Sequence, residues 1–326
     1  MVYILFLIGI VLLIKGADWL VEGASSIASR FGVSELVVGL TVVSFGTSMP
    51  ELVVNLLASF NGSSELAIGN VVGSNIANVL LILGVAAIVR PLAIQKSIYF
   101  TEIPISLMAT FMVGFLANAD LFVSGHSLSL SRMDGVILLV FFSLFMAYIF
   151  VVSKSKEPGL QEAEPTKASP ESDARGSIPK AALWIGLGVM GLFLGGKWVV
   201  EGAVFIAQSF GLSETLIGLT VVAIGTSLPE LVTSAVAAYK GQAGMAVGNV
   251  IGSNIFNLLW ILGLSAVINP LPFDVATNSD ILMIIIASTL PLIAVIVGRK
   301  PRINRFEGVI FIGIYIAYVV YLIQRG

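Results

Sequence analysis

The chain carries an internal duplication. Residues 16–92 repeat as residues 195–271 at a constant offset of 179 and without a gap, and 42 of the 77 pairs are identical. The matching blocks are GLTVV..GTS.PELV, at 39–53 and 218–232, and GN..GSNI.N, at 69–78 and 248–257. Shared hydrophobicity alone does not place Gly, Pro, Glu and Asn at the same offsets. The sequence therefore consists of two related halves that we expect to fold alike.

Long apolar stretches fill both halves. Hydrophobic residues make up 57% of the chain and charged residues 11%, with a mean hydropathy of +1.01, whereas soluble domains carry about 25% charged residues. About 20 apolar residues cross the hydrocarbon core as a helix. We therefore predict an all-α integral membrane protein, with the N-terminal stretch read as a membrane helix and not as a cleaved signal. Ten transmembrane helices are expected near 2–26, 34–60, 66–89, 98–118, 133–152, 181–205, 214–239, 245–268, 280–298 and 307–323.

The boundary between the halves is a polar segment rich in Pro, Ser and charge, from Lys154 to Lys180. Such a composition is typical of a flexible linker. The predicted organisation is an N-terminal five-helix repeat (1–152), a linker (153–180) and a C-terminal five-helix repeat (181–326).

The positions of Lys and Arg predict the orientation in the membrane. Thirteen of the 17 basic residues fall in alternate connections, which share one side if there are ten spans. Both termini should then face outside, and the linker should be cytoplasmic, in the cell (inner) membrane. Because each half holds an odd number of helices, the second half enters from the opposite face. Such inverted-topology repeats are typical of secondary transporters, with the substrate site near the midplane; a duplication kept only as a scaffold is the alternative.

An acidic residue lies in the middle of an apolar helix in each half. Glu51 and Glu230 occupy equivalent places in the second and seventh predicted helices. An ionisable side chain at membrane depth is costly and indicates function by default. The structural alternatives are a carboxyl held neutral, or one paired with a buried base such as Lys15 or Lys197.

Each of these glutamates follows a proline, Pro50 or Pro229, that follows Gly-Thr-Ser. Proline removes a backbone donor and breaks or kinks a helix, so helices 2 and 7 should be broken, leaving carbonyls that a cation can satisfy. Helical spacing places further polar groups on the same faces. The candidate metal-binding set is Ser44, Thr47, Ser48 and Glu51, with Ala223, Thr226, Ser227 and Glu230, and, from helices three and eight, Ser74, Asn78, Ser253 and Asn257.

These ligands are carboxylate, hydroxyl, amide and carbonyl oxygens. The chain has no cysteine and one histidine, His126, so thiolate and multi-histidine metal sites are excluded, as are disulfides. Oxygen ligands suit hard cations: calcium takes about 6–8 of them with flexible geometry, whereas magnesium demands a stricter octahedron. We also expect Gly69, Gly73, Gly248 and Gly252 to allow close helix packing.

The paired G-T-S-x-P-E and G-S-N-I-x-N blocks resemble the sodium/calcium exchanger family of the calcium/cation antiporter superfamily, in its compact prokaryotic form. The resemblance implies Na+/Ca2+ exchange by alternating access, with the ions bound by Glu51 and Glu230. It also implies that one helix pair, helices one and six, moves across a fixed core. The remaining implied ligands are the hydroxyls and carbonyls of Thr47, Ser48, Thr226 and Ser227, the carbonyls of Ser44 and Ala223, and Ser74, Asn78 and Ser253.

One position departs from the family pattern, because Asn257 stands where many sodium/calcium exchangers carry aspartate. The site therefore has two central carboxylates, not three, which weakens the case for potassium dependence. The linker is also too short for the calcium-sensing domains that larger members insert there.

Several other functions stay open at this point. A proton-coupled calcium antiporter would use the same glutamates, and a cation channel or a non-transporting scaffold fits less well. No nucleophile–base constellation suggests an enzyme, no cofactor is expected beyond the transported Na+ and Ca2+, and no basic aromatic surface suggests nucleic acid. The expected partner is membrane lipid, and the expected state is a monomer.

Overall fold

The computed structural model describes residues 2–62, 64–119, 128–154, 177–210, 223–298 and 301–325. Within these ranges the chain is helical apart from short turns and four two-residue strands. Eight helices or continuous helical runs are long and apolar enough to cross a membrane. They are Val2–Phe31, Ala67–Val89, Ile98–Ala117, Arg132–Lys154, Ile178–Ser209, Ala243–Ile268, Val275–Val297 and Arg305–Arg325.

A ninth candidate span is bent. Helices α2 (Glu35–Val38) and α3 (Ser44–Thr47), joined by a π-helical turn, continue into α4 (Met49–Phe60) through a bend of 48°. The seventh predicted helix, 214–239, is described only from residue 223, as α11 (Ala223–Thr226) and α12 (Leu228–Tyr239). The multi-pass membrane class is confirmed, and the predicted ends of the described helices agree with the structure to within about five residues.

The bend occurs where the proline predicts it. Ser48 leaves the helical conformation (φ −83°, ψ 6°), and Pro50 lies in the first turn of α4. There the missing proline N–H costs nothing, because the first N–H groups of a helix have no intrahelical partner. Ser227 has nearly the same conformation (φ −88°, ψ 6°) before Pro229. The same sequence pattern, Ser-x-Pro, thus ends a helix in both halves.

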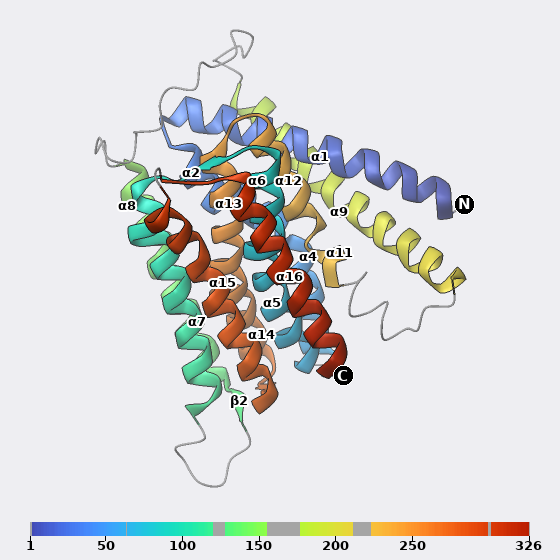
Figure 1. Ribbon diagram of the computed structural model, residues 1–326, viewed down its shortest axis with the longest axis vertical. Coiled ribbons are helices and arrows are strands. Elements are labelled where there is room, and N and C mark those ends of the chain that lie inside the picture. Colours follow the sequence, from blue (N-terminus) through green and yellow to red (C-terminus); the bar gives the residue numbers. More distant parts are fainter. Residues whose placement is uncertain are drawn as a thin grey trace.

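The two short sheets mark opposite ends of the bundle (Figure 1). Strand β1 (Leu92–Ala93) pairs antiparallel with β4 (Arg302–Ile303), and β2 (Ser129–Leu130) pairs with β3 (Leu271–Pro272). Leu92 and Leu271 are equivalent in the duplication, since they differ by 179. Equivalent connections of the two halves therefore lie at opposite ends of the molecule.

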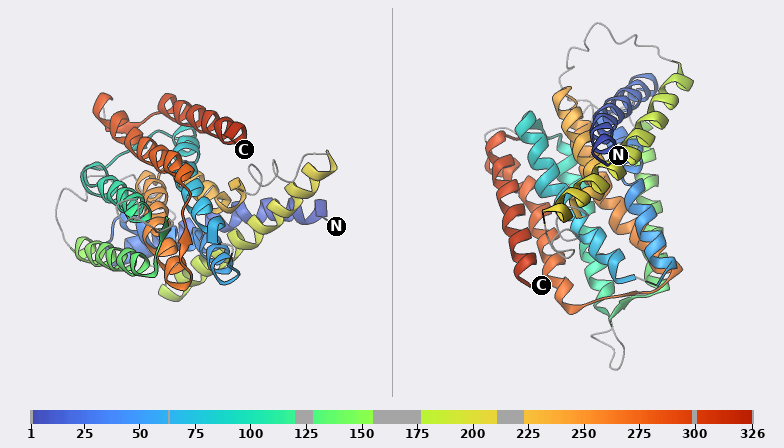
Figure 2. Two further views of the ribbon diagram at one scale, coloured as in Figure 1. Left: turned by 90° about the horizontal axis from the view of Figure 1, so that it is seen from below. Right: turned by 90° about the vertical axis from the view of Figure 1, so that its right-hand side faces the viewer.

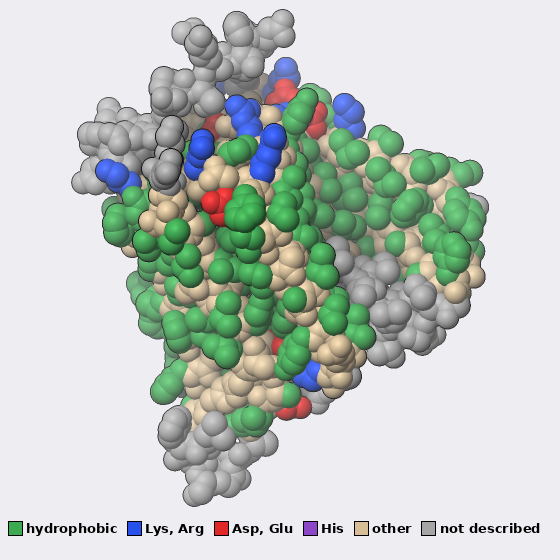
Figure 3. All heavy atoms as spheres, viewed as in Figure 1, with side chains coloured by type: hydrophobic (Ala, Val, Ile, Leu, Met, Phe, Trp, Pro, Cys, Tyr) green, Lys and Arg blue, Asp and Glu red, His purple; other side chains and the backbone are tan. Residues whose placement is uncertain are grey.

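Basic side chains gather at one of these ends. Exposed Arg90, Lys96, Arg302 and Arg305 flank the β1–β4 sheet, and Figure 3 shows Lys and Arg concentrated at the upper end of the molecule, above a largely hydrophobic side surface. An apolar belt is the surface that a membrane protein presents to lipid, and basic side chains gather beyond it at one end.

The centre of the bundle is formed by one helical run from each half. The first run is α5 (Ser64–Ala77), the π-helical η2 (Asn78–Ile82) and α6 (Leu83–Val89). The second is α13 (Ala243–Ile255), the π-helical η7 (Phe256–Ile261) and α14 (Leu262–Ile268). In each of these runs 78% of the residues in an apolar 18-residue stretch are buried, against 22–39% in the corresponding stretches of the other long helices. Around them stand α7 (Ile103–Ala117), α8 (Arg132–Lys154), α15 (Asn278–Val297) and α16 (Arg305–Arg325).

Two long helices, α1 (Val2–Phe31) and α9 (Ile178–Ser209), lie side by side across this bundle and extend beyond it (Figures 1 and 2). Glycines occur every seven residues in both, and their backbones meet. A Cβ atom at Gly16 would lie 2.8 Å from the Leu192 nitrogen and 2.9 Å from the Gly188 oxygen, and one at Gly195 would lie 2.7 Å from the Leu13 nitrogen. The pair therefore depends on positions that have no side chain.

Replacing Gly16 by alanine tests this contact. Because the new methyl group would meet main-chain atoms, we expect the free energy of unfolding to fall by about 1–3 kcal/mol, as for other overpacked sites. Thermal denaturation of the purified protein in detergent measures the change. Gly186→Ala, also on the α1–α9 pair, is the control, because no described atom lies within 4 Å of a Cβ built there; equal losses in the two variants would contradict the interpretation.

Candidate ion-binding site

The two central glutamates lie in the first turns of α4 and α12, where the bent segments restart. Both side chains are almost fully buried, with 1% of each exposed. The positive end of a helix dipole favours a negative charge at this position. Glu51 and Glu230 also lie close enough for their charges to interact. The structure thus brings together the two acidic residues that the duplication singles out.

Serines from each half contact the glutamate of the other half. The Ser48 hydroxyl donates a hydrogen bond to Glu230 Oε1 (2.9 Å) and lies 3.0 Å from Ser253 Oγ. In the equivalent position Ser227 lies against Glu51, and its hydroxyl is 3.4 Å from Ser74 Oγ. Four candidate serines therefore join the two halves around the carboxylates: Ser48, Ser74, Ser227 and Ser253.

A residue that sequence reasoning missed, Asn249, extends this network. Its side-chain oxygen accepts a hydrogen bond from the Thr47 hydroxyl (3.0 Å), and its amide nitrogen donates to Ser234 Oγ (2.9 Å). Asn249 and Ser234 are both fully buried. The Thr47 hydroxyl is thereby directed to another protein group, in addition to the Ser44 carbonyl at 3.3 Å.

Asn78 and Asn257 lie in the π-helical turns of the two central runs, and 1% of each is exposed. Their amide nitrogens donate across the interface between halves, from Asn78 to Asn254 Oδ1 (2.9 Å) and from Asn257 to Asn75 Oδ1 (3.0 Å). Asn75 and Asn254 also escaped the sequence analysis. The signal was present, since Asn70, Asn75 and their counterparts Asn249 and Asn254 recur at the offset of 179.

Four carboxylate and amide oxygen atoms of the candidate set are buried and have no hydrogen-bond donor among the described residues. They are Glu51 Oε2, Glu230 Oε2, Asn78 Oδ1 and Asn257 Oδ1. The four form two pairs related by the duplication. Buried acceptors are nearly always satisfied in folded proteins, so unpaired ones require a specific explanation.

Neither candidate lysine neutralises the glutamates. Lys15 is exposed on α1, and Lys197 Nζ lies 3.9 Å from Glu201 with 58% of its side chain exposed. Within the described residues, no group of three or more His, Cys, Asp and Glu forms a cluster. The fixed charge at this place is therefore that of two carboxyl groups.

The remaining candidates are partly settled. The Ser44 hydroxyl donates to the Thr41 carbonyl (3.2 Å), and Thr226 Oγ1 is buried without a partner among the described residues. The side chain of Ala223 lies outside what the structure describes.

The predicted close packing holds at Gly248 and Gly252, where a Cβ would lie 2.6 Å from the Leu36 oxygen and 2.7 Å from Ser44 Oγ. No described atom comes within 4 Å of such a Cβ at Gly69 or Gly73.

The chain is similar to known proteins along nearly its whole length. The family model described as "Sodium/calcium exchanger protein" matches residues 1–151 and 180–324. The chain is 34% identical to the sodium/calcium exchanger MaX1 of Methanosarcina acetivorans, over 98% of both chains. It belongs to the sodium/calcium exchanger family.

Two further similarities cover nearly the whole chain. The putative antiporter CaxA of Alkalimonas amylolytica is 39% identical over 97% of this chain and 96% of that protein. A solved structure of the sodium-calcium exchanger NCX_Mj, soaked with 10 mM Na+ and zero Ca2+, matches with a TM-score of 0.80 at 32% identity and covers 98% of this chain and 99% of that one. Family membership makes the chain a membrane antiporter of the sodium/calcium exchange type.

Asn249→Leu tests the hydrogen bonds that join the halves beside the glutamates. The substitution conserves size but leaves the buried Ser234 hydroxyl without its partner and the Thr47 hydroxyl with only the Ser44 carbonyl, so we expect a loss of about 1–3 kcal/mol in the free energy of unfolding. Adding Ser234→Ala should recover part of that loss, because it removes one of the stranded groups. Thermal unfolding in detergent measures both variants, and strictly additive losses would argue against the network.

Proposed function

We propose that this protein exchanges Na+ for Ca2+ across the membrane, with the ions bound between Glu51 and Glu230. The observation that carries the proposal is the set of four buried, unpaired carboxylate and amide oxygens, two from each half. Two are carboxylate oxygens and two are amide oxygens, which is the ligand chemistry of hard cations. The other proposed ligands are Ser44, Thr47, Ser48, Ala223, Thr226, Ser227, Ser74 and Ser253.

Electrostatics explains why such a site would exchange ions. The two glutamates supply a charge of −2 when ionised, which one Ca2+ cancels and which two or more Na+ also offset. Leaving two such charges unpaired in a low-dielectric interior is costly. A protein that closes over the site only when it is neutralised must return with one ion type after releasing the other, and that requirement is antiport.

The proposed architecture has ten membrane helices in two inverted five-helix repeats (1–152 and 181–326), with helices 2 and 7 broken at the glutamates. The placement of Leu92 and Leu271 at opposite ends of the bundle supports the inversion. The basic residues around the β1–β4 sheet support a cytoplasmic position for that end, for the linker (153–180) and hence an outside position for both termini. A relative in Escherichia coli, 36% identical over 98% of this chain, is named inner membrane protein YrbG, and we propose the inner membrane for this chain also.

Alternating access would move α1 and α9 as one unit across the other helices. Their backbones are in direct contact, so the two helices have little freedom to separate. Two side-chain contacts tie α1 to the connection between α12 and α13: Asp18 forms an ion pair with Lys240, and Gln242 Nε2 donates to Ser25 Oγ (2.6 Å). These contacts are polar and partly exposed, so they can break as the unit moves.

A proton-coupled calcium antiporter is the second candidate. It would use the same unpaired carboxyl oxygens, Glu51 Oε2 and Glu230 Oε2, because a proton neutralises a carboxylate as a sodium ion does. A cation channel fits less well, since these oxygens are buried between the halves and not arranged around an open pore.

Uptake of radioactive 45Ca2+ into proteoliposomes separates these possibilities. Sodium-loaded vesicles diluted into sodium-free buffer at equal pH should take up Ca2+ if Na+ is the counter-ion. A pH gradient without sodium should drive uptake if protons are, and uptake without either gradient would indicate a channel. Failure of a sodium gradient to drive uptake by the intact protein would overturn the leading proposal.

The glutamates are tested in the same vesicles. Glu51→Gln and Glu230→Gln each remove one of the two charges while conserving size, and we expect each to lower sodium-driven Ca2+ uptake at least about 100-fold, the scale on which a buried charged ligand contributes. Glu22→Gln is the matched control, because Glu22 is exposed on α1, and it should leave uptake near the parental rate. Parental uptake by the Glu51→Gln, Glu230→Gln double variant would show that the ions bind elsewhere.

A further inference from the structure

Four asparagines connect the two central helical runs through a closed set of hydrogen bonds. We name Asn75, Asn78, Asn254 and Asn257 the asparagine bridge. Asn75 Nδ2 donates to the Asn254 main-chain oxygen, and Asn254 Nδ2 donates to the Asn75 main-chain oxygen, both at 3.3 Å. The side-chain oxygens of the same two residues accept from Asn257 (3.0 Å) and Asn78 (2.9 Å). The pattern is reciprocal between the halves.

This pattern fixes which way round each amide lies. A main-chain oxygen can only accept, so the side-chain atoms facing the Asn75 and Asn254 carbonyls must be the nitrogens. The other side-chain atom of each is then an oxygen, and the group of Asn257 or Asn78 that it meets must be a donor. The two backbone carbonyls thus determine all four amide orientations.

The consequence concerns the outer two residues of the bridge. With their nitrogens committed, Asn78 and Asn257 retain their side-chain oxygens, which are buried and accept no hydrogen bond from any described residue. These are the amide oxygens assigned above to the ion site. Their availability as acceptors depends on Asn75 and Asn254.

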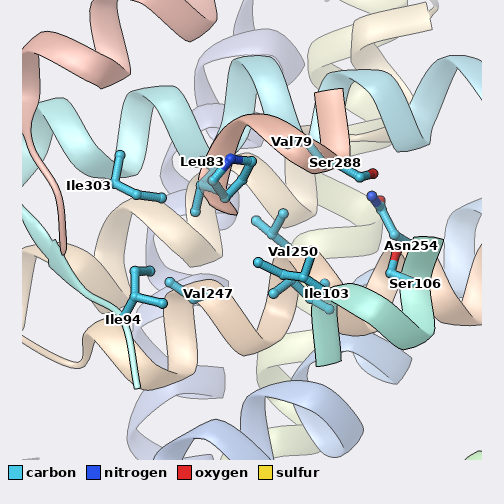
Figure 4. A pocket seen from close by; sticks show the side chains of 12 residues that line it. Val79, Leu83, Ile94, Ile103, Ser106, Val247, Val250, Asn254, Ser288 and Ile303 are labelled. Carbon is cyan, nitrogen blue, oxygen red and sulfur yellow. The ribbon is translucent and has the colours of Figure 1, made fainter. Parts of the chain in front are cut away.

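Asn254 lies at one end of a cavity of about 20 Å³. Of the other lining residues, Ser106 and Ser288 lie beside Asn254 at that end, and the rest are apolar (Figure 4). Away from these two serines, an unpaired amide would face apolar side chains, where it costs free energy. In the bridge both polar atoms of the Asn254 side chain are paired, Nδ2 with the Asn75 main-chain oxygen and Oδ1 with Asn78 Nδ2.

We propose that Asn75 and Asn254 are positioning residues that hold the amides of Asn257 and Asn78 with their oxygens toward the transported cation. The inference rests on the proposed function and adds to it a reason for the residue at position 257. An aspartate there has no N–H to donate to Asn75 Oδ1, so the bridge in its present form requires an amide. In this chain the neutral ligand at position 257 is matched to its neighbour across the interface.

Asn75→Leu is the first test, in sodium-loaded proteoliposomes with 45Ca2+. The change conserves size and removes the acceptor that orients Asn257, so its amide can turn its nitrogen toward the cation. We expect the Michaelis constant for Ca2+ to rise about 10- to 100-fold, the range of one hydrogen bond or ligand to a charged group, with a smaller change in maximal rate. Asn75→Ala repeats the test with a smaller side chain in case leucine does not fit.

A double variant distinguishes positioning from general loss of structure. If Asn75 acts through Asn257, then Asn75→Leu added to Asn257→Ala should raise the Michaelis constant no further, because the oriented oxygen is already gone. Asn118→Leu is the matched control. Asn118 and Asn278 form another reciprocal asparagine pair, between the end of α7 and the start of α15, with donor–acceptor distances of 2.8 and 2.9 Å; breaking it should lower thermal stability and leave the Michaelis constant unchanged.

The outcomes separate the two proposals. A parent protein without sodium-driven uptake overturns the proposed function. An active parent with an unchanged Michaelis constant in Asn75→Leu or Asn75→Ala, or with a further rise in the double variant, overturns the positioning role. Should neither Asn75 variant fold, a crystal structure of the parent with Ca2+ decides: Asn78 or Asn257 Oδ1 within about 2.3–2.6 Å of the ion supports the inference, as is usual for calcium ligands, and both oxygens turned away from the ion refutes it.

Discussion

The constraint on which this structure depends is that a polar group placed in lipid must find its partner inside the protein. In this chain the partners of the central polar groups come from the opposite half. Ser48 donates to Glu230, Thr47 to Asn249 and Asn78 to Asn254. Without the opposite half, Glu230 Oε1 and Asn78 Nδ2 would lose these partners, and the Thr47 hydroxyl would keep only the Ser44 carbonyl. The two halves therefore satisfy each other's buried polar groups, and the proposed ion site lies where acceptors remain unpaired.

The sequence predicted the membrane class, the positions of the helices and the central pair of glutamates, because those features depend on local composition and on the repeated Gly-Thr-Ser-x-Pro-Glu segment. It did not predict which groups meet across the halves. An offset of 179 states that Asn75 and Asn254 are equivalent, yet equivalence says nothing about contact, and the reciprocal hydrogen bonds between them follow only from how the two central runs cross. The heptad glycines of α1 and α9 were missed for the same reason: their role becomes visible only when the two helices are seen to touch along the main chain.

Residues that the duplication repeats form different contacts from those that it does not repeat. The glutamates, the serines around them and the asparagine bridge are duplicated, and they form contacts related by the internal symmetry. The ion pair between Asp18 and Lys240 is not duplicated, because the equivalent positions are Lys197 and Asn61. Nor is the pair between Asp280 and Arg325, whose Nη1 and Nη2 each lie 2.9 Å from a carboxylate oxygen. Contacts that distinguish one end of the molecule from the other thus arise where the repeat is broken.

The repeated residues also determine how many ligands of the proposed site are charged and how many are neutral. If the central site binds cations as proposed, its fixed charge comes from Glu51 and Glu230 alone, and the asparagines complete the coordination shell without changing that charge. A third carboxylate at position 257 would bind a divalent ion more tightly and would also make the ion-free site costlier to enclose. It would further face the oxygen of Asn75, which now accepts a hydrogen bond from Asn257. An amide at this position therefore reconciles two requirements, an oxygen for the cation and a donor for the opposite half, that a carboxylate meets only in part.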